Sequence, residues 1–158
     1  MRIGILLFLM ACSFCVGMAV QAGKGKTSER ARVTGIGGVF FKSADPAKLN
    51  AWYEKNLGIK PREGAQPGEP AMFEWRDKQH PDAVGVTVWS LFPKGTKYFA
   101  PSQASFMINY RVDDLDRLLA QLRAAGVQVD SKTSEDFTGK FGWAMDPEGN
   151  RIELWEPK

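Results

Sequence analysis

The sequence predicts an α+β fold made of two βαβββ modules, which form curved, half-barrel sheets around a cleft with the helices outside. Strand-like and helix-like segments recur twice in the same order, matching positions of the two copies keep a constant spacing, and the last segment alternates as a strand does. The modules span residues 35–92 and 105–156. With 158 residues, 44% of them hydrophobic, the chain has enough material for one core.

The last strand is the most clearly marked element. Asp146-Pro147-Glu148-Gly149 is typical of a tight turn, and a strand is expected over residues 151–156. Ile152 and Leu154 then point to one face, whereas Glu153 and Trp155 point to the other. A carboxylate on an inward face requires a metal, an ion pair or a solvated cleft.

The first module begins with a strand and a helix. Pro46 suits the first turn of a helix, and Gly58 is typical of the residue that follows a helix. The module is therefore predicted to contain a strand over residues 37–42, a helix over 45–57, and strands over 60–63, 72–75 and 84–91.

The second module repeats this order. Its predicted elements are a strand over residues 106–112, a helix over 114–125, and strands over 127–130, 141–145 and 151–156. Lys42 matches Arg111, and Asp45 matches Asp114, at one constant spacing. The segment 86–89 is expected to correspond to 152–155. The two copies indicate an internal duplication.

Alternation along the strands divides the sheet into two faces. One face packs against the helices, where Trp52 is expected in the core. The other face is predicted to line the cleft, and an aromatic lining with a few polar groups suits a small organic ligand. The residues assigned to this cleft face are Gly38, Phe40, Thr87, Trp89, Met107, Asn109, Glu153 and Trp155.

The paired modules and their motifs resemble the vicinal oxygen chelate superfamily, which includes glyoxalases, bleomycin-resistance proteins, extradiol dioxygenases and several epimerases. The resemblance covers residues 33–157, within a predicted domain of residues 33–158. The motifs that carry it are Ser43-Ala44-Asp45, Val112-Asp113-Asp114-Leu115 and the closing Asp146-Pro147-Glu148-Gly149-Asn150-Arg151-Ile152-Glu153-Leu154.

The resemblance implies metal ligands on the first and last strand of each module. Those positions hold Gly38, Thr87, Met107 and Glu153, of which Glu153 alone is a competent ligand for a divalent ion. We therefore expect no metal or other cofactor, with a divalent metal at relocated ligands as the alternative. His80 is the only histidine and lies in a polar turn, so it is expected in solvent.

Three roles remain open for Glu153. It could form an ion pair with Arg111 or Lys42, contact a ligand, or act as a metal-free general base. The last role requires a raised pKa beside Trp89 and Trp155. The tryptophans on strands are equally consistent with core packing and with ligand stacking.

The first 22 residues are predicted to be a signal peptide, because Arg2 precedes an apolar run that ends at Val20-Gln21-Ala22. A membrane anchor or a lipid attached at Cys12 are the alternatives. Residues 23–32 are polar and basic and are expected to form a flexible linker. Cys12 and Cys15 lie in the leader, so the mature protein would contain no cysteine.

The leading hypothesis is an exported, periplasmic or secreted, glyoxalase/bleomycin-resistance-like protein that binds a small organic molecule and has a degenerate metal site. The alternatives are a lyase or isomerase of the glyoxalase type, and a structural or partner-binding module of the envelope. Loss of Arg2 with the leader lowers the net charge from +3 to +2, which is too mild to indicate nucleic acid. The resemblance also leaves a homodimer open.

Overall fold

The computed structural model describes residues 30–66, 68–78 and 81–158. The predicted signal peptide and His80 lie outside the described residues. In chain order the elements are β1 (Val33–Ser43), α1 (Pro46–Leu57), β2 (Ala71–Arg76), β3 (Val84–Pro93), β4 (Phe106–Val112), α2 (Leu115–Ala124), β5 (Ser134–Asp136), β6 (Gly139–Met145) and β7 (Arg151–Pro157). Within these described residues no helix is both long and apolar enough to span a membrane.

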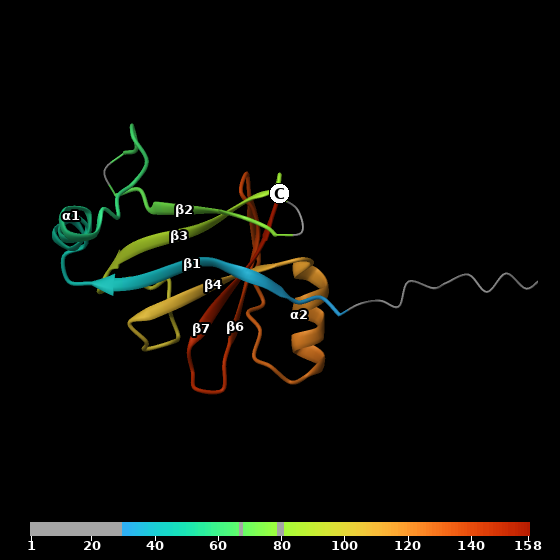
Figure 1. The fold of residues 1–158 in the computed structure, drawn as a ribbon. Helices are drawn as coiled ribbons and strands as arrows, with labels where there is room; N and C mark the ends of the chain where they lie inside the picture. The colour runs from blue at the N-terminus through green and yellow to red at the C-terminus, as the bar shows by residue number, and fades with distance from the viewer. Residues whose placement is uncertain (1–29, 67, 79–80) are drawn as a thin grey trace, which may run out of the picture.

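The strands form one continuous mixed sheet of seven strands, in the order β2-β3-β1-β4-β7-β6-β5 (Figure 1). β1 and β4 pair antiparallel at its centre, and each also pairs in parallel with the last strand of its own module, β3 or β7. The predicted α+β class is confirmed, and a strand, a helix and further strands recur in both modules, although the described part of the first module has two strands after its helix where three were predicted. The two modules share a single sheet because their first strands lie edge to edge.

Two predicted strands are absent from the described residues. Residues 60–63 form a loop and the start of a turn, because Pro61 lacks an N–H donor and Ala65 N donates to Arg62 O (3.1 Å). Residues 127–130 make only brief contact with β6, through a single bridge between Val129 and Ala144. The outer strand of the second module is instead β5.

The register of the central strands corrects the predicted alignment of the two modules. Val39 and Ile108 pair with each other and occupy equivalent positions in the two modules. One residue earlier the equivalent positions are Gly38 and Met107, and one residue later they are Phe40 and Asn109. Phe40 pairs with Ser90 in β3, and Asn109 pairs with Glu153 in β7. Ser90 is therefore the counterpart of Glu153, and the expected match of residues 86–89 with 152–155 is wrong.

The two helices pack very differently. Asp114 caps α2 by accepting from Arg117 N (2.9 Å), and three leucines of this helix are buried against Val112 and Leu154. Asp45 caps α1 in the same way (3.0 Å), but α1 has no buried residue. Figure 1 shows α1 past the end of β1, away from the middle of the sheet.

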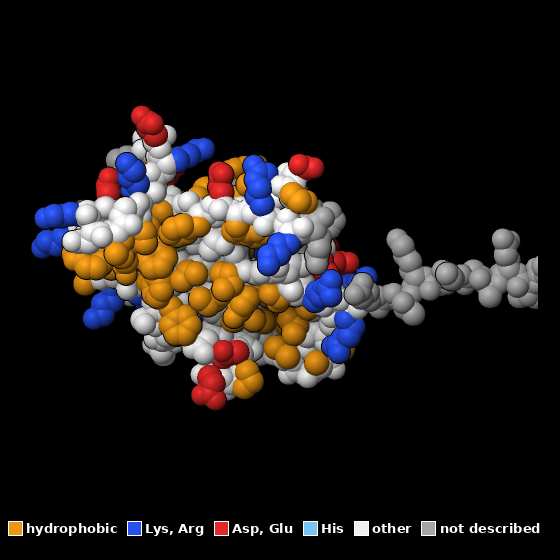
Figure 2. Space-filling view, viewed as in Figure 1, with side chains coloured by type: hydrophobic (Ala, Val, Ile, Leu, Met, Phe, Trp, Pro, Cys, Tyr) orange, Lys and Arg blue, Asp and Glu red, His pale blue; other side chains and the backbone are white. Residues whose placement is uncertain are grey.

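Trp52 is 53% exposed, so its predicted place in the core is wrong. Because α1 lies at the end of the sheet, it leaves apolar surface of the strands uncovered. Figure 2 shows a hydrophobic band across the face over β1, and Val33 and Ile36 of that strand are both exposed. A capped helix thus forms in each module, but only α2 closes a core beneath it.

The last residues of the predicted linker contact the second module. Ala31 is buried, and its N and O atoms bond the side-chain amide of Gln121 (both 2.9 Å). Arg32 N donates to the Asp113 carboxylate (2.9 Å). The chain therefore enters β1 already held against α2 and the end of β4.

Candidate functional site

The candidate site lies on the inner face, defined here as the face of the sheet that carries Phe40, Met107 and Glu153. Phe40 pairs with Met107, Asn109 pairs with Gly38 and Glu153, and residues that pair across strands point to the same side. Trp155 follows Glu153 by two positions and shares this side. The structure thus brings together five of the predicted lining side chains, namely Phe40, Met107, Asn109, Glu153 and Trp155.

Trp89 lies on the opposite face, so its predicted place in the cleft is wrong. It pairs with Val39, and its ring lies 5.1 Å from that of Phe41 and 5.0 Å from that of Tyr53 in α1. Thr87 shares the parity of Trp89, and its hydroxyl donates to Ile36 O (2.7 Å). The inner-face positions of β3 are taken by Val88 and Ser90, which pair with Gly38 and Phe40.

Glu153 forms the polar centre of the inner face, with only 1% of its surface exposed. Its carboxylate accepts hydrogen bonds from Asn109 Nδ2 (2.8 Å), Trp143 Nε1 (2.9 Å) and the Tyr98 hydroxyl. All three donors are neutral groups. Buried carboxylates need such donors because water cannot reach them.

Of the three roles left open for Glu153, the ion pair with Arg111 or Lys42 does not form. Arg111 lies over the Trp75 ring at 5.4 Å, and Lys42 lies over the Phe99 ring at 5.1 Å. Both cations therefore contact aromatic rings instead of the carboxylate. Hydrogen bonds from neutral side chains replace the charge pairing that the sequence had suggested.

The loop between the two modules covers this centre. Tyr98 stacks on Phe92, with ring centroids 5.4 Å apart and planes 3° from parallel, and its hydroxyl reaches Glu153. Phe99 is fully buried with Phe40, Met107 and Trp143. The part of the inner face above Glu153 is therefore filled by the protein's own side chains.

Sequence reasoning missed Tyr98 and Phe99. Pro93, Gly95 and Pro101 mark this segment as a loop, and residues of loops are usually placed at the surface. The available signal was the pair of adjacent aromatic residues within an otherwise polar segment. Such a pair is costly to leave in water and indicates that the loop packs back onto the protein.

The environment of Tyr98 raises the pKa of its phenol well above the ordinary value. Burial is the largest cause, followed by the charge of Glu153 and the hydrogen bond that the phenol donates to it. A raised pKa in the folded state stabilises the fold below the unfolded value of about 10, and this contribution is lost as the pH rises through the folded pKa. Titration of Tyr98 should therefore change the stability of the protein only at alkaline pH.

We expect Tyr98→Phe to be less stable than the wild type at neutral pH, by about 1 kcal/mol, because one hydrogen bond to Glu153 is lost. Above about pH 10 the wild type should lose stability faster than the variant, so the gap should narrow. Urea unfolding across the alkaline range measures this difference. Parallel curves for the two proteins would show that Tyr98 titrates as an ordinary tyrosine.

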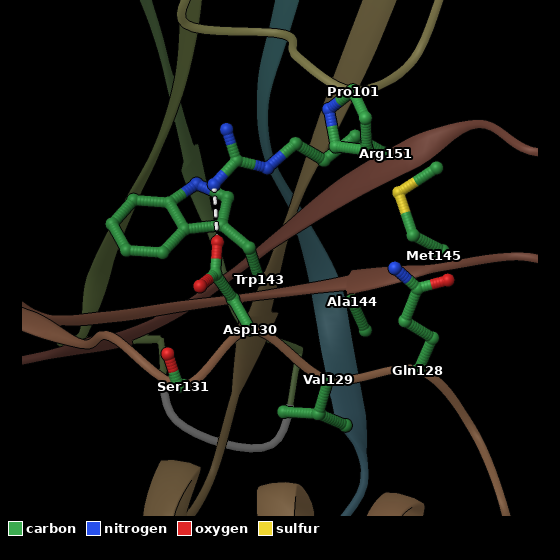
Figure 3. Close-up of a pocket in the computed structure, with 9 residues that line it drawn as sticks. All are labelled: Pro101, Gln128, Val129, Asp130, Ser131, Trp143, Ala144, Met145 and Arg151. Atoms are coloured by element: carbon green, nitrogen blue, oxygen red, sulfur yellow. Dashed lines mark hydrogen bonds and ion pairs between the residues drawn. The ribbon is translucent and has the colours of Figure 1, made fainter.

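A cavity of about 380 Å³ adjoins the Glu153 centre. Trp143 separates the two, because its Nε1 atom donates to Glu153 while the residue also lines the cavity. Figure 3 shows the Arg151 guanidinium beside the indole of Trp143 and paired with Asp130. We call this space the Trp143 cavity, and it is lined by Pro101, Gln128, Val129, Asp130, Ser131, Trp143, Ala144, Met145 and Arg151.

The charges of the Trp143 cavity balance each other. Arg151 Nη2 lies 2.9 Å from Asp130 Oδ2, and the other guanidinium nitrogen donates to Tyr98 O. The side chain of Arg151 is 13% exposed, which strengthens this pair relative to one in open solvent. Arg151 also connects the cavity to the loop that carries Tyr98.

The inner face does not fit the divalent metal found in metal-dependent members of the superfamily. With the corrected register, the four positions hold Gly38, Ser90, Met107 and Glu153, which supply one carboxylate and no imidazole. Both oxygens of that carboxylate already accept bonds from protein donors. No group of three or more His, Cys, Asp or Glu side chains suited to a metal occurs in the described parts of the chain.

The family described as Glyoxalase-like domain matches residues 38–155 of this chain. The match covers most of the sequence and both modules, so the protein belongs to the glyoxalase-like family of the vicinal oxygen chelate superfamily. The resemblance read from the Asp146–Leu154 motif is thereby confirmed. No curated protein matches the sequence.

Solved structures share the fold at low sequence identity. A methylmalonyl-CoA epimerase from Streptomyces coelicolor, in complex with 2-nitronate-propionyl-CoA, is 16% identical, with a TM-score of 0.56 over 80% of this chain and 99% of that one. A Mn(II)-bound glyoxalase from Novosphingobium aromaticivorans is 22% identical, with a TM-score of 0.54 over 80% and 40%. These likenesses establish the architecture alone.

Proposed function

We propose that this protein binds a small organic molecule in the Trp143 cavity and does so without a divalent metal. The observation that carries the proposal is a cavity of about 380 Å³ next to a carboxylate whose two oxygens are both occupied by protein donors. Ligand pockets are concave, mostly apolar and supplied with a few polar groups. The lining of the Trp143 cavity is about half apolar, and its polar groups are Gln128, Asp130, Ser131 and Arg151.

Metal independence is supported by the chemistry of the side chains present. Gly38 has no ligand atom, a neutral serine hydroxyl at position 90 is a poor ligand, and the thioether of Met107 suits soft cations. Catalytic metal sites use about three protein ligands together with an open position. One carboxylate held by Asn109 and Trp143 falls short of this requirement.

The lining of the cavity favours an uncharged, partly apolar ligand. Pro101, Val129 and Met145 offer apolar surface, and the indole of Trp143 offers a flat one. The positive charge of Arg151 is already compensated by Asp130 (2.9 Å). Two polar residues, Gln128 and Ser131, can hold a hydroxyl or carbonyl of the ligand. Methylmalonyl-CoA epimerases of this fold hold acyl-CoA-type ligands, which supports small-molecule binding by the architecture.

Binding of benzyl alcohol, followed by saturation-transfer nuclear magnetic resonance, tests this proposal. We expect weak, saturable binding that is unchanged by EDTA. Ser131→Phe should weaken it by about tenfold, or about 1.4 kcal/mol, because the added ring fills the cavity. Ser134→Phe adds the same ring at another exposed serine and should leave binding unchanged. Absence of binding, or loss of binding with EDTA, would overturn the proposal.

A second candidate is metal-free proton transfer by Glu153. The support for it is a buried carboxylate bonded to the Tyr98 phenol, a group that could return a proton; a substrate would reach this carboxylate only by displacing Tyr98. The reaction class would be exchange of a proton next to a carbonyl. Deuterium incorporation into an acyl thioester, abolished in Glu153→Gln, would favour this candidate over simple binding.

We also propose that the protein is exported through residues 1–22, so that binding takes place outside the cytoplasm. The support is the apolar run that follows Arg2 and ends in Val20-Gln21-Ala22. A mature N-terminus at Gly23, found by N-terminal sequencing of the natural protein, is the expected result. Retention of Met1 would contradict it.

A further inference from the structure

We propose a second binding site on the inner face, built around Arg111, which takes a flat aromatic monocarboxylate. Its hollow of about 310 Å³ lies at the far end of β7 from the Trp143 cavity, since Arg151 begins this strand and Trp155 lies near its end. We call it the Arg111 hollow. It is lined by Val84, Gly85, Val86, Arg111, Phe137, Thr138, Trp155, Pro157 and Lys158.

Arg111 supplies a cation whose N–H groups are not used by a carboxylate. Its guanidinium lies over the Trp75 ring (5.4 Å) and has no ion pair within residues 30–66, 68–78 and 81–158. Two nearby acids bond backbone groups instead. Glu156 accepts from Leu115 N (2.7 Å), and Asp113 accepts from Arg32 N (2.9 Å). A half-buried guanidinium without a carboxylate partner favours binding of an anionic ligand.

A flat apolar side chain lies beside Arg111 because Gly37 allows the Trp155 indole to lie against the strand, and Arg111 pairs with Trp155. A Cβ atom at Gly37 would come within 2.7 Å of the Trp155 ring. Trp155 is also fixed by its bond from Nε1 to Thr138 O (3.1 Å). Trp155 also stacks on Phe141 (6.3 Å, 9°), so the ring of a ligand would contact the exposed part of this rigid indole together with Val84 and Phe137 of the lining.

The charge balance of the hollow indicates a ligand with one negative charge. Its other lining cation, Lys158, is already engaged by Glu135 (3.3 Å) and by Asp136 O (2.7 Å). On the other side of Arg111, the lining of a neighbouring hollow includes Asp113 and Glu156, whose carboxylates would repel a second negative charge. A carboxylate also matches the planar fork of a guanidinium with two parallel hydrogen bonds.

Benzoate and its neutral counterpart benzamide test this site by titration of the tryptophan Nε1–H resonances, assigned with Trp155→Phe. We expect benzoate to shift the Trp155 signal and to bind at least about tenfold more tightly than benzamide, as the charge-assisted hydrogen bonds require. Arg111→Gln should reduce benzoate binding to the level of benzamide. Arg117→Gln, which removes an arginine of α2, should leave it unchanged.

Further variants keep the proposal separate from the Trp143 cavity. Ser131→Phe should not alter benzoate binding, and Arg111→Gln should not alter benzyl alcohol binding. If Arg111→Gln fails to fold, Arg111→Lys keeps the charge but loses the fork and should bind benzoate more weakly than the wild type. Equal affinity for benzoate and benzamide, or a benzoate response confined to Trp143, would overturn the proposal.

Discussion

Glu153→Ala should lower the free energy of unfolding by about 3–5 kcal/mol, as measured by urea denaturation. The substitution leaves buried donors of Asn109, Trp143 and Tyr98 without their acceptor, and it also opens a cavity at a position that is 1% exposed. A buried donor without a partner loses its hydration and gains nothing in return. The loss should therefore exceed that of a surface carboxylate many times over.

Glu153→Gln serves as the matched control. It retains the volume of the side chain and one acceptor oxygen, so its cost should be about 1–2 kcal/mol. Addition of Mg²⁺ or Zn²⁺ should not widen the difference between wild type and Glu153→Ala, because the carboxylate is held by protein donors. Less than about 1 kcal/mol for the alanine variant would show that the three hydrogen bonds do not organise the inner face.

Much of the architecture could be predicted because the signals are local. Asp45 and Asp114 cap helices where expected, and the turn before Arg151 leads into a strand that places Glu153 inward. These features depend on residues close together in the chain. The inward face was predicted correctly for four residues of the second module, which lie on strands with a clear alternation or with a marked turn before them. These residues are Met107, Asn109, Glu153 and Trp155.

The face of β3 could not be predicted in the same way. Its sequence is apolar at both parities, because Val86 and Val88 alternate with Thr87, Trp89 and Leu91. Periodicity therefore does not indicate which side chains of β3 face the cleft. The match of Trp89 to Trp155 suggested the wrong face for Trp89. Pairing with β1 decides the face, and pairing is a property of the whole sheet.

The covering of Glu153 by residues of the 94–104 loop also could not be derived from local pattern. Tyr98 and Phe99 are far from β7 in sequence, and their contacts depend on the path of a loop that carries no periodic signal. Trp52 shows the opposite effect. A large apolar residue on a helix is usually buried, but α1 lies past the end of β1 and leaves Trp52 exposed.

Phe99→Ala should destabilise the protein by about 3–5 kcal/mol, because this side chain is fully buried between Phe40, Met107 and Trp143. The remaining cavity has apolar walls, so it should stay dry and accept a small apolar molecule such as toluene. Loss of the ring should also loosen Tyr98 and bring the pKa of its phenol closer to the ordinary value. Urea unfolding, toluene binding and alkaline titration measure the three effects.

Phe137→Ala provides the control, since Phe137 is 89% exposed and its truncation should change stability by less than about 0.5 kcal/mol. Toluene binding by Phe99→Ala that persists when Ser131→Phe fills the Trp143 cavity would mean that the sheet forms a hollow over Glu153 and that the loop fills it. In that case the side chains of the loop block the hollow over Glu153, and the Trp143 cavity is left as the space for a ligand. Equal costs for the two alanine variants would instead show that Phe99 does not hold the loop in place.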